Sequence, residues 1–367
     1  MEKNNIAARR MPAEWEKQSA VLLSWPHAGT DWAYILEEIE KVFVEMAKAI
    51  AHHENLIITG EAAEHAAELL KPLMPPEDYN RITAFKCPNN DTWIRDYGPL
   101  TVFIENNGQD CQPNDDRRAS LNYPLSIIHY PLAISNRFNG WGGKFEASKD
   151  NNVCHELFTK TNLFPHYEEH PDFELEGGSL ECDGKGTIFT TASCLLNANR
   201  NGGLSQEEAE SRLKQLFNVE RVLWLFHSYL VGDDTDGHID MLMRICPDDT
   251  IVYQGCDDTE DEQYEELLAM QHEIEAFRTL EGKEYRLLRL PLPKAIFDED
   301  GERLPASYAN YLVINGAVLL PVYQQPSDDE AIKILAQAYP NHKIIPIFSV
   351  PLIKQHGAVH CSTMQLY

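Results

Sequence analysis

The sequence reads Asp31-Trp-Ala-Tyr-Ile-Leu-Glu-Glu-Ile-Glu-Lys-Val-Phe-Val-Glu-Met-Ala-Lys-Ala-Ile-Ala-His-His53 and then, after Glu54, Asn55-Leu-Ile-Ile-Thr-Gly60. In the first segment the apolar side chains recur at steps of three and four residues, which predicts a helix with one buried face. The second segment is short, rich in β-branched residues and ended by a glycine, so it predicts a strand. A helix followed at once by a strand is typical of an α/β fold.

The same alternation continues along the chain. Further helices are expected near 61–70, 148–160, 205–217, 260–280 and 328–339. Strands are expected at 19–24, 82–86, 100–104, 125–130, 186–191, 221–225, 239–246, 250–254, 285–290, 310–315, 317–322 and 343–347. Ser205 with Glu208 predicts a capping box, and Asn315-Gly316 predicts a hairpin. The helices recur about every 50 to 60 residues, which indicates a repeated unit.

The chain is strongly acidic. It has 31 Lys and Arg against 58 Asp and Glu among 367 residues, a formal net charge of −27. A nucleic-acid partner or an anionic membrane surface is disfavoured, because both bind a surplus of basic residues. The charge is compatible with a small cationic ligand, and equally with a surface that is acidic for solubility alone.

The cysteines and the N-terminus indicate a cytoplasmic protein with free thiols. The eight cysteines include no Cys-x-x-Cys pair, and unpaired thiols persist in a reducing compartment. The first residues hold no apolar run that could serve as a signal peptide. Apolar runs elsewhere, such as Ala20 to Leu23, are far too short to cross a bilayer.

Several common motifs do not occur in the sequence. It holds no phosphate-binding loop, no dinucleotide-binding glycine motif, no HExxH and no GxSxG. The run from Gly232 to Asp240 superficially resembles a calcium loop. Aligning Gly237 with the sixth position of an EF-hand puts Gly232 at the first ligand position and Met243 at the twelfth, where neither side chain offers an oxygen. The calcium interpretation therefore fails.

Four other segments combine glycine, aromatic and charged residues where a strand is expected to end. They are Asn90-Asp-Thr-Trp-Ile-Arg-Asp-Tyr-Gly-Pro99, Leu175-Glu-Gly-Gly-Ser179, Asp236-Gly-His-Ile-Asp240 and Gly357-Ala-Val-His-Cys-Ser362. Each alone has an ordinary structural explanation, such as a turn or a small buried cysteine. Together they supply a thiol, an imidazole and several carboxylates, the set needed for nucleophilic attack on a guanidinium carbon.

This chemistry makes a separate demand on each group. Paired carboxylates match the planar guanidinium with charge-assisted hydrogen bonds. The nucleophile has to be a thiolate, which a nearby cation favours by lowering the thiol pKa. A histidine then protonates the leaving ammonia and later activates water.

Six motifs resemble, in order, those of the guanidino-group-modifying superfamily, in the branch of agmatine deiminases and bacterial peptidylarginine deiminases. They extend from near Met11-Pro-Ala-Glu-Trp15 to the C-terminal end and are Trp93-Ile-Arg-Asp-Tyr-Gly-Pro99, Phe138-Asn-Gly-Trp-Gly-Gly143, Glu176-Gly-Gly178, Gly237-His-Ile-Asp240, Pro305-Ala-Ser-Tyr-Ala-Asn310 and His360-Cys361. The resemblance implies a five-bladed α/β propeller (pentein fold) of ββαβ units around a central active-site tunnel. It also implies that residues 1–367 form a single catalytic domain.

The resemblance further implies roles for individual residues. Cys361 would be the nucleophile and His238 the general acid and base, while Asp96 and Asp240 would bind the guanidinium and Glu176 would orient the histidine. The expected substrate-binding residues are Trp93, which would wall the pocket, Asp234, which matches a substrate-binding acid of agmatine deiminases, and Asp91, a further acid near the site. No metal and no cofactor are expected.

The segment before the expected nucleophile departs from the family pattern. Agmatine deiminases carry Gly-Gly-Gly-Asn there, whereas this chain has Lys354-Gln-His-Gly-Ala358. Asp236 and Met241 flank the Gly-His-x-Asp motif where asparagines are usual. Agmatine remains the expected substrate, because surplus acids near the site (Asp91, Asp233, Asp234 and Asp236) favour a dication over a substrate that carries a carboxylate.

The expected reaction is hydrolysis of agmatine to N-carbamoylputrescine and ammonia through an amidino-cysteine intermediate, as in putrescine and polyamine biosynthesis. Peptidylarginine or another guanidino compound is the alternative substrate. A metal hydrolase is a rival enzyme class, with His356, His360, Cys361 and His238 among its ligands. A cation-binding propeller without thiol catalysis is the non-enzymatic rival, and a homodimer is left open.

Overall fold

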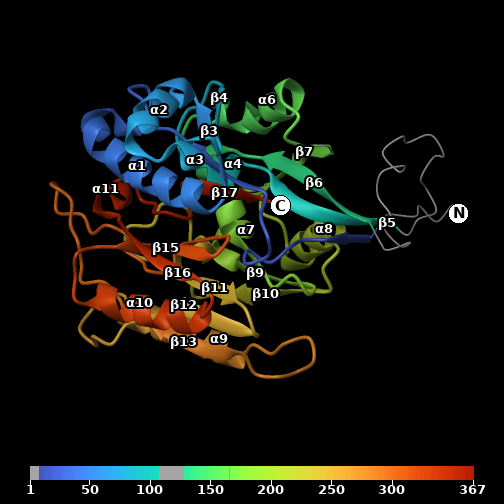
Figure 1. The fold of residues 1–367 in the computed structure, drawn as a ribbon. Helices are drawn as coiled ribbons and strands as arrows, with labels where there is room; N and C mark the ends of the chain where they lie inside the picture. Colours follow the sequence, from blue (N-terminus) through green and yellow to red (C-terminus); the bar gives the residue numbers. More distant parts are fainter. Residues whose placement is uncertain (1–7, 107–127, 165) are drawn as a thin grey trace, which may run out of the picture.

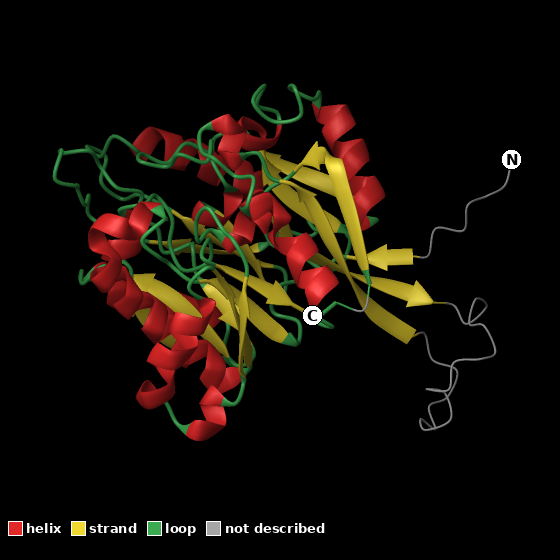
Figure 2. Cartoon of the chain, turned by 90° about the horizontal axis from the view of Figure 1, so that it is seen from above, coloured by secondary structure: helices red, strands yellow, loops and turns green. Residues whose placement is uncertain are grey.

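The computed structural model describes residues 8–106, 128–164 and 166–367 (Figure 1). Within these ranges the strands form five sheets, and each sheet contains two antiparallel strands followed by a parallel one. The helices lie mostly toward the outside, with α1 and α2 along one edge of the molecule and α9 and α10 along the opposite edge in Figure 1. Figure 2 shows separate strand groups from above, with helices between and outside them.

The segment quoted first forms the crossover of one sheet. A short 3-10 turn, η1 (Asp31–Ile35), leads into α1 (Leu36–His53), which connects the parallel strands β2 (Ala20–Ser24) and β3 (Asn55–Gly60). A parallel pair needs such a crossover because its strands run in the same direction. The apolar face of α1 is buried as predicted, including Ile39, Phe43 and Ile50.

The last strand of the described chain joins the early strand β2 in this same sheet. Its strand order is β17-β2-β3-β4, where β4 (Ile82–Lys86) is parallel to β3 and β17 (Thr363–Leu366) is antiparallel to β2. The helices α2 (Ala63–Leu70) and α3 (Pro76–Tyr79) and the turn η2 (Lys71–Leu73) connect β3 to β4.

The other four sheets repeat the same order of elements: a strand, a second strand antiparallel to it, a helix, and a third strand parallel to the second. This order confirms the predicted repeated unit. They contain β5 (Leu100–Asn106), β6 (Ile128–Arg137), α6 (Val153–Lys160) and β7 (Tyr167–Glu174); β8 (Leu180–Cys182), β9 (Thr187–Thr191), α8 (Gln206–Phe217) and β10 (Arg221–Leu225); β11 (Met243–Cys246), β12 (Thr250–Gln254), α9 (Tyr264–Ala276) and β13 (Arg286–Leu290); and β14 (Leu312–Ile314), β15 (Ala317–Val322), α10 (Ser327–Ala338) and β16 (Lys343–Phe348). β1 (Ala8–Arg10) pairs with β5.

Local sequence signals are confirmed where they are strong. Ser205 caps α8 in a full capping box with Glu208, and Asn315-Gly316 joins the antiparallel strands β14 and β15. Each of the six predicted helices has a counterpart. Among the described residues, we find no helix with the length and apolarity that a membrane-spanning segment requires.

Two strand predictions need correction, and four strands were not predicted: β1, β7, β8 and β17. The strand expected at 239–246 begins only at Met243, because Ile239–Met241 form the 3-10 turn η6. The strand expected at 125–130 begins at Ile128 and runs to Arg137, and positions 125–127 lie outside the described residues. β7 was missed, since it is a polar edge strand that contains Pro171, both features that lower a strand prediction.

The predicted motif segments lie in the connections from the last strand of one sheet to the first strand of the next, so they follow a strand, as residues 175–179 follow β7 directly, and also precede one. The helix α4 (Ile94–Tyr97) precedes β5, and the turn η5 (Gly177–Ser179) precedes β8. The turn η6 precedes β11, Asn310 precedes β14, and Cys361 precedes β17. Each repeated unit therefore delivers one short polar segment from the same place in its connection pattern.

Candidate active site

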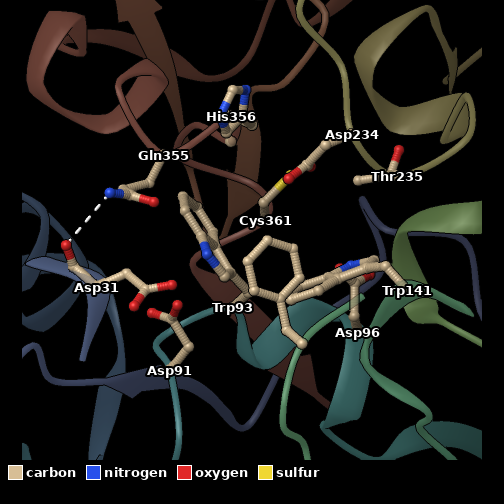
Figure 3. Close-up of a pocket in the computed structure, with 12 residues that line it drawn as sticks. Asp31, Asp91, Trp93, Asp96, Trp141, Asp234, Thr235, Gln355, His356 and Cys361 are labelled. Atoms are coloured by element: carbon tan, nitrogen blue, oxygen red, sulfur yellow. Dashed lines mark hydrogen bonds between the residues drawn. The ribbon is translucent and has the colours of Figure 1, made fainter. Parts of the chain in front are cut away.

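A pocket lies where several of these segments converge (Figure 3). The empty space among its lining side chains is about 400 Å³, which includes solvent at its open side. Five residues with a predicted role line it: Asp91, Trp93, Asp96, Asp234 and Cys361. Seven lining residues had no predicted role in binding substrate: Asp31, Trp141, Phe145, Thr235, Gln355, His356 and Gly357. The remaining predicted residues, Glu176, His238 and Asp240, are buried next to the pocket.

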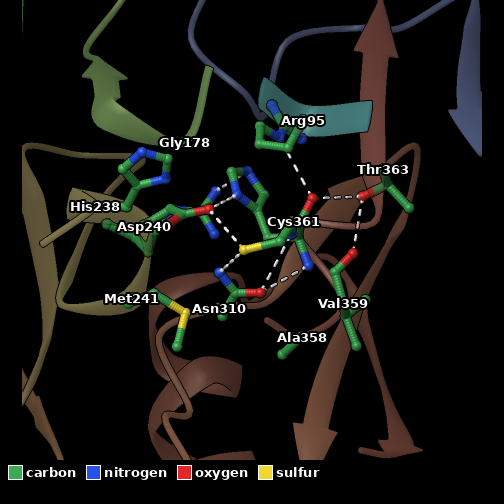
Figure 4. Close-up of polar contacts among 12 residues, drawn as sticks. Arg95, Gly178, His238, Asp240, Met241, Asn310, Ala358, Val359, Cys361 and Thr363 are labelled. Atoms are coloured by element: carbon green, nitrogen blue, oxygen red, sulfur yellow. Dashed lines mark hydrogen bonds and ion pairs between the residues drawn. The ribbon is translucent and has the colours of Figure 1, made fainter. Parts of the chain in front are cut away.

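The thiol of Cys361 is held between an amide and a carboxylate (Figure 4). Asn310 Nδ2 donates to the sulfur at 3.1 Å, and the thiol donates to Asp240 Oδ2 at 3.5 Å. Burial raises the pKa of Cys361 well above its ordinary value, and the charges of Asp240 and Asp96 raise it further. The prediction that a cation lies beside the thiol is therefore wrong for the protein without substrate, because the charged groups that act on Cys361 are the carboxylates of Asp240 and Asp96.

His238 is buried against two acids. Its Nε2 lies 3.3 Å from Glu176 Oε2, and its Nδ1 lies 3.6 Å from Asp96 Oδ1 without forming a hydrogen bond to any described residue. Burial alone would lower the pKa of His238, but Asp96 and Glu176 help to raise it well above its ordinary value. The ring is therefore poised as an imidazolium that can give a proton from Nδ1.

The turn before His238 is fixed by a neighbouring acid. Asp233 accepts hydrogen bonds from the Gly237 amide at 2.8 Å and from Thr235 Oγ1 at 2.7 Å. Gly237 has a φ of +91°, a conformation that favours glycine. Asp233 thus shapes the backbone of the motif and does not line the pocket.

Asp96 accepts two hydrogen bonds. Trp141 Nε1 donates to its Oδ2 at 2.9 Å, and the Gly178 amide donates to its Oδ1 at 2.9 Å. Burial raises the pKa of Asp96 to about 6 although His238 lowers it, and Glu176 and Asp240 add to the rise. The carboxyl is therefore mostly ionised at neutral pH and becomes protonated just below it.

Asp240 differs from Asp96 in having one oxygen free. Its Oδ2 accepts from His360 Nδ1 at 2.7 Å, whereas its buried Oδ1 has no hydrogen-bond partner in the described part of the chain. Burial would raise its pKa, but the hydrogen bond from His360 holds the pKa below its ordinary value. A buried carboxylate oxygen without a partner is costly unless a ligand supplies one.

The glycine pair after Glu176 allows three polar side chains to meet. A Cβ on Gly178 would lie 2.6 Å from His238 Nδ1 and 2.9 Å from Asp96 Oδ1. A Cβ on Gly177 would collide with the Arg95 carbonyl oxygen. The Glu-Gly-Gly motif therefore marks a close backbone approach that a larger residue would prevent.

Comparison with known proteins agrees with this geometry. The family model of the Porphyromonas-type peptidyl-arginine deiminases matches residues 10–366. The chain belongs to this deiminase family.

Individual relatives align with nearly the whole length of this chain. A solved structure from Porphyromonas gingivalis, provisionally named an arginine deiminase, is 42% identical with a TM-score of 0.85, covering 97% of this chain and 98% of that one. An agmatine deiminase of Campylobacter jejuni, solved as a cysteine-to-serine variant with substrate bound, is 33% identical with a TM-score of 0.83, covering 98% and 96%. A Mycoplasma capricolum protein, provisionally named an agmatine deiminase, is 32% identical, covering 97% and 94%.

The predicted substrate-binding acids of this deiminase-family chain divide into two groups. Burial raises the pKa of Asp91 to about 7, and the charges of Asp31 and Asp234 add to it. Burial also raises the pKa of Asp234. Asp236, by contrast, accepts from Lys144 Nζ at 2.9 Å and from Arg200 Nη1 at 2.6 Å, so its charge is already balanced.

Trp93 forms part of the pocket wall, as predicted. Its ring lies 5.5 Å from that of Trp32, tilted by 50°. A Cβ on Gly357 would collide with the Trp93 ring, so the one glycine kept before the nucleophile gives this ring its space. The departures Gln355 and His356 also line the pocket, and His356 adopts a φ of +65° while its Nδ1 donates to the Gly232 carbonyl at 2.7 Å.

The deiminase interpretation of the sequence assigned no role to three residues that hold the site. They are Trp141, Asn310 and His360. Each stands inside one of the six motifs, so its position in the sequence already indicated a role at the site. Arg200 lies outside every motif and gave no signal. Its Nε donates to both oxygens of Glu176, at 2.9 and 3.2 Å.

Two groups of side chains have the spacing of a metal site, but arginines already occupy them. Glu176, Cys194 and His238 form one group, in which Arg200 binds the carboxylate. Glu14, Glu181 and His360 form the other, in which Arg244 binds both carboxylates. The ligand set of the metal-hydrolase rival is not one of the groups found among residues 8–106, 128–164 and 166–367.

Proposed function

We propose that this chain is an agmatine deiminase, which hydrolyses agmatine to N-carbamoylputrescine and ammonia through a covalent amidino-thioether on Cys361. The observation that carries the proposal is a thiol flanked by the buried carboxylates of Asp96 and Asp240 in a pocket that no described lysine or arginine lines. Such a charge pattern is complementary to a cation. The substrate-bound agmatine deiminase among its relatives supports the same substrate.

The guanidinium would bind between the two carboxylates. The free Oδ1 of Asp240 is an acceptor that the described residues leave unused. Asp96, which the Trp141 and Gly178 donors orient, offers its remaining lone pairs. Two carboxylates facing the N–H groups of a planar guanidinium fix its central carbon with respect to the sulfur.

Binding of the guanidinium would supply the positive charge that the thiol lacks. The chain alone keeps Cys361 protonated, because burial and two carboxylates raise its pKa. A cation placed beside the sulfur stabilises the thiolate, and the thiol proton leaves by way of its hydrogen bond to Asp240. The nucleophile is then formed mainly when a guanidinium occupies the pocket.

In the first step the thiolate attacks the guanidinium carbon and forms a C–S bond. His238 gives the proton at Nδ1 to one amino group, whose C–N bond breaks to release ammonia. The product on the enzyme is an amidino-thioether at Cys361, and the histidine is neutral. Glu176 holds the opposite ring nitrogen, so the ring keeps its orientation as its charge changes.

In the second step a water molecule takes the place of the ammonia. Neutral His238 accepts a proton from this water, whose oxygen attacks the amidino carbon. The C–S bond then breaks, which returns the thiolate and leaves a ureido group on the product. The second proton of the water is lost as the ureido carbonyl forms. A guanidinium and one water thus give a ureido group, ammonia and one proton, so atoms and charge balance.

Other acids of the pocket favour an ammonium group. Asp31, Asp91 and Asp234 line the same pocket as Cys361, and burial, with the charges of Asp31 and Asp234, raises the pKa of Asp91 to about 7. An ammonium bound there would restore the ionised form of Asp91. The carboxylate of arginine would be repelled by the same groups, although a relative provisionally named an arginine deiminase makes arginine the second candidate.

We also propose that the five repeated units close into a five-bladed propeller and that residues 1–367 form one catalytic domain. The shared connection pattern and the sheet that joins β17 to β2 support this arrangement. A cytoplasmic location is proposed as well, in keeping with the thiols of the described cysteines, all of which are free.

The decisive experiment compares three substrates with the wild type and Cys361→Ala. Ureido product and ammonia are measured from agmatine, arginine and a blocked arginyl peptide. We expect the highest kcat/KM for agmatine and no turnover by Cys361→Ala. Equal activity in the alanine variant would refute the nucleophile, and a preference for arginine or the peptide would refute the substrate.

A further inference from the structure

A buried chain of three side chains runs behind the guanidinium site. His360 Nδ1 lies 2.7 Å from Asp240 Oδ2, and His360 Nε2 lies 2.8 Å from Glu14 Oε1 and 3.0 Å from Arg244 Nη2. Burial and the charge of Arg244 lower the pKa of His360, which favours a neutral ring whose proton faces Asp240 and whose Nε2 accepts from Arg244. His360 and Asp240 are fully buried, and Glu14 is largely so. Of these three side chains, only Asp240 has a part in the proposed reaction. Glu14 comes from the segment that precedes β2, more than 300 positions from His360 in the sequence.

His360 determines which oxygen of Asp240 is available. A carboxylate can rotate to present either oxygen, and a buried one does so unless hydrogen bonds hold its plane. The ring N–H occupies Oδ2, which is also the oxygen nearest the thiol at 3.5 Å. Oδ1 is thereby left without a partner among the described residues. The guanidinium acceptor is therefore defined by the histidine behind it.

The His360 backbone is held by residues that also hold the thiol. Its amide donates to Asn310 Oδ1 at 3.1 Å, and the Cys361 amide donates to the same oxygen at 3.3 Å. The Arg95 amide donates to the Cys361 carbonyl at 3.2 Å (Figure 4). The ring therefore has little freedom to move without moving the nucleophile.

Glu14 lies on the other side of the ring and balances two buried cations. Its Oε1 lies 3.4 Å from Arg95 Nη1, and its Oε2 contacts Arg244 Nη2. Burial would raise the pKa of Glu14, but Arg244 and Arg95 hold it well below its ordinary value. Without this negative charge the two guanidinium groups would place positive charge behind a site that has to bind a cation.

We propose that His360 is a positioning residue of the deiminase site, which orients Asp240 so that one oxygen receives the substrate cation, and that Glu14 supports this orientation by holding Arg244, the donor to the opposite ring nitrogen. The proposal rests on the proposed function for its substrate. Neither residue touches the substrate, and both act through Asp240.

The experiment compares His360→Asn with His360→Leu. Asparagine can place an amide N–H near the position of the histidine Nδ1, whereas leucine has no donor. Cys361 is alkylated in each protein with two reagents, a cationic haloacetamidine and neutral iodoacetamide. The ratio of the two rates measures cation binding at the thiol and needs no turnover. Thermal unfolding and KM and kcat for agmatine complete the comparison.

We expect the ratio of cationic to neutral alkylation to fall by about tenfold or more in His360→Leu, with a matching rise in KM. In His360→Asn we expect the ratio to remain within about threefold of the wild type. An unchanged ratio in folded His360→Leu would overturn the proposal. An equal fall in both rates, without a change in their ratio, would also overturn it in favour of a merely structural role.

Glu14→Gln provides a second route if His360→Leu does not fold. It keeps the size of the side chain and removes its charge, so we expect a smaller fall in the ratio, about threefold, with retained thermal unfolding. An unchanged ratio would remove Glu14 from the proposal. If the wild type shows cation-selective alkylation but no turnover of agmatine, the proposed substrate fails while the positioning role of His360 is still tested by the variants.

Discussion

The indole Nε1 of Trp141 donates a hydrogen bond of 2.9 Å to Oδ2 of Asp96. Trp141 has a φ of +54° within the Gly140–Gly143 turn, so the backbone of this turn is shaped to bring the ring to the carboxylate. A donor to an ionised carboxylate stabilises the charged form. The bond therefore counteracts the burial that raises the pKa of Asp96 to about 6.

Replacing Trp141 by Phe should make activity more sensitive to acid. Asp96 has to be ionised to bind a guanidinium, so activity is lost as the pH falls through the pKa of this carboxyl. Losing a hydrogen bond to a charged group costs about 1.5–3 kcal/mol, so we expect kcat/KM at pH 6 to fall roughly five- to tenfold or more and to recover toward pH 8. The measurement is a pH profile of kcat/KM for agmatine. Trp224→Phe is the control, because Trp224 donates to Glu210 at 3.0 Å and does not line the pocket.

Gly178→Ala should abolish most of the activity while leaving the fold intact. The added methyl group would lie 2.6 Å from His238 Nδ1 and force the ring away from Asp96. We expect kcat to fall by about 100-fold, since misplacement of a catalytic group by about 1 Å has effects of this size. Gly301→Ala is the control for an added methyl group far from the site, because a Cβ there meets no atom within 4 Å; its φ of +86° should cost stability and leave kcat unchanged. Full activity of Gly178→Ala would show that the ring position is not critical.

Arg200→Met should shift the pH dependence and weaken the fold together. Arg200 is buried with Glu176, and breaking such a pair leaves an uncompensated charge at a cost of about 3–5 kcal/mol. Glu176 would then act on His238 with its full charge, which raises the pKa of the ring further and moves the alkaline limb of the profile to higher pH. Urea unfolding and kcat against pH measure the two effects.

The matched control for Arg200 is Arg212→Met, because Arg212 pairs with the exposed Asp172 at the surface. We expect this variant to lose less than about 1 kcal/mol in the free energy of unfolding. Its pH profile should match the wild type. A profile that stays in place in Arg200→Met, with stability reduced, would mean that Arg200 serves the fold alone.

Glu54 should make the protein less stable as the pH rises from mildly acidic to neutral. Burial raises the pKa of this carboxyl from 4.5 to about 7, although the Asn315 amide donates to it at 2.9 Å. The folded chain keeps a proton that the unfolded chain releases between these values, so the free energy of unfolding falls across that window. Glu54→Gln should flatten this dependence between pH 4.5 and 7, whereas exposed Glu64→Gln should leave it unchanged. Thermal unfolding at several pH values provides the measurement.

Much of the fold was predictable where a few neighbouring residues determine the structure. The apolar steps of α1, the capping box of α8 and the turn at Asn315-Gly316 act over short distances, and all three are confirmed. The pairing of β17 with β2 depends on residues more than 300 positions apart, which no local pattern indicates. β7 remained hidden because a polar edge strand lacks the apolar alternation on which strand prediction depends.

The candidate site was predictable in its reacting groups and not in their supports. The thiol, imidazole and carboxylates were identified from their types and motifs, and all lie in or beside one pocket. The contact of Glu14 with His360 and that of Arg200 with Glu176 depend on how the units meet in space. The electrostatic surroundings of Cys361 were wrongly anticipated for the same reason, since burial and the partner charges appear only in the folded chain.

The order of elements along the chain has a consequence for synthesis. Cys361 stands just before β17, and β17 pairs with β2, a strand that is synthesised long before it. A nascent chain that has grown only to residue 350 already carries the acids and the imidazole of the pocket but lacks Cys361. The ribosome thus makes the nucleophile after the groups that surround it, and the site becomes competent only when β17 docks onto β2.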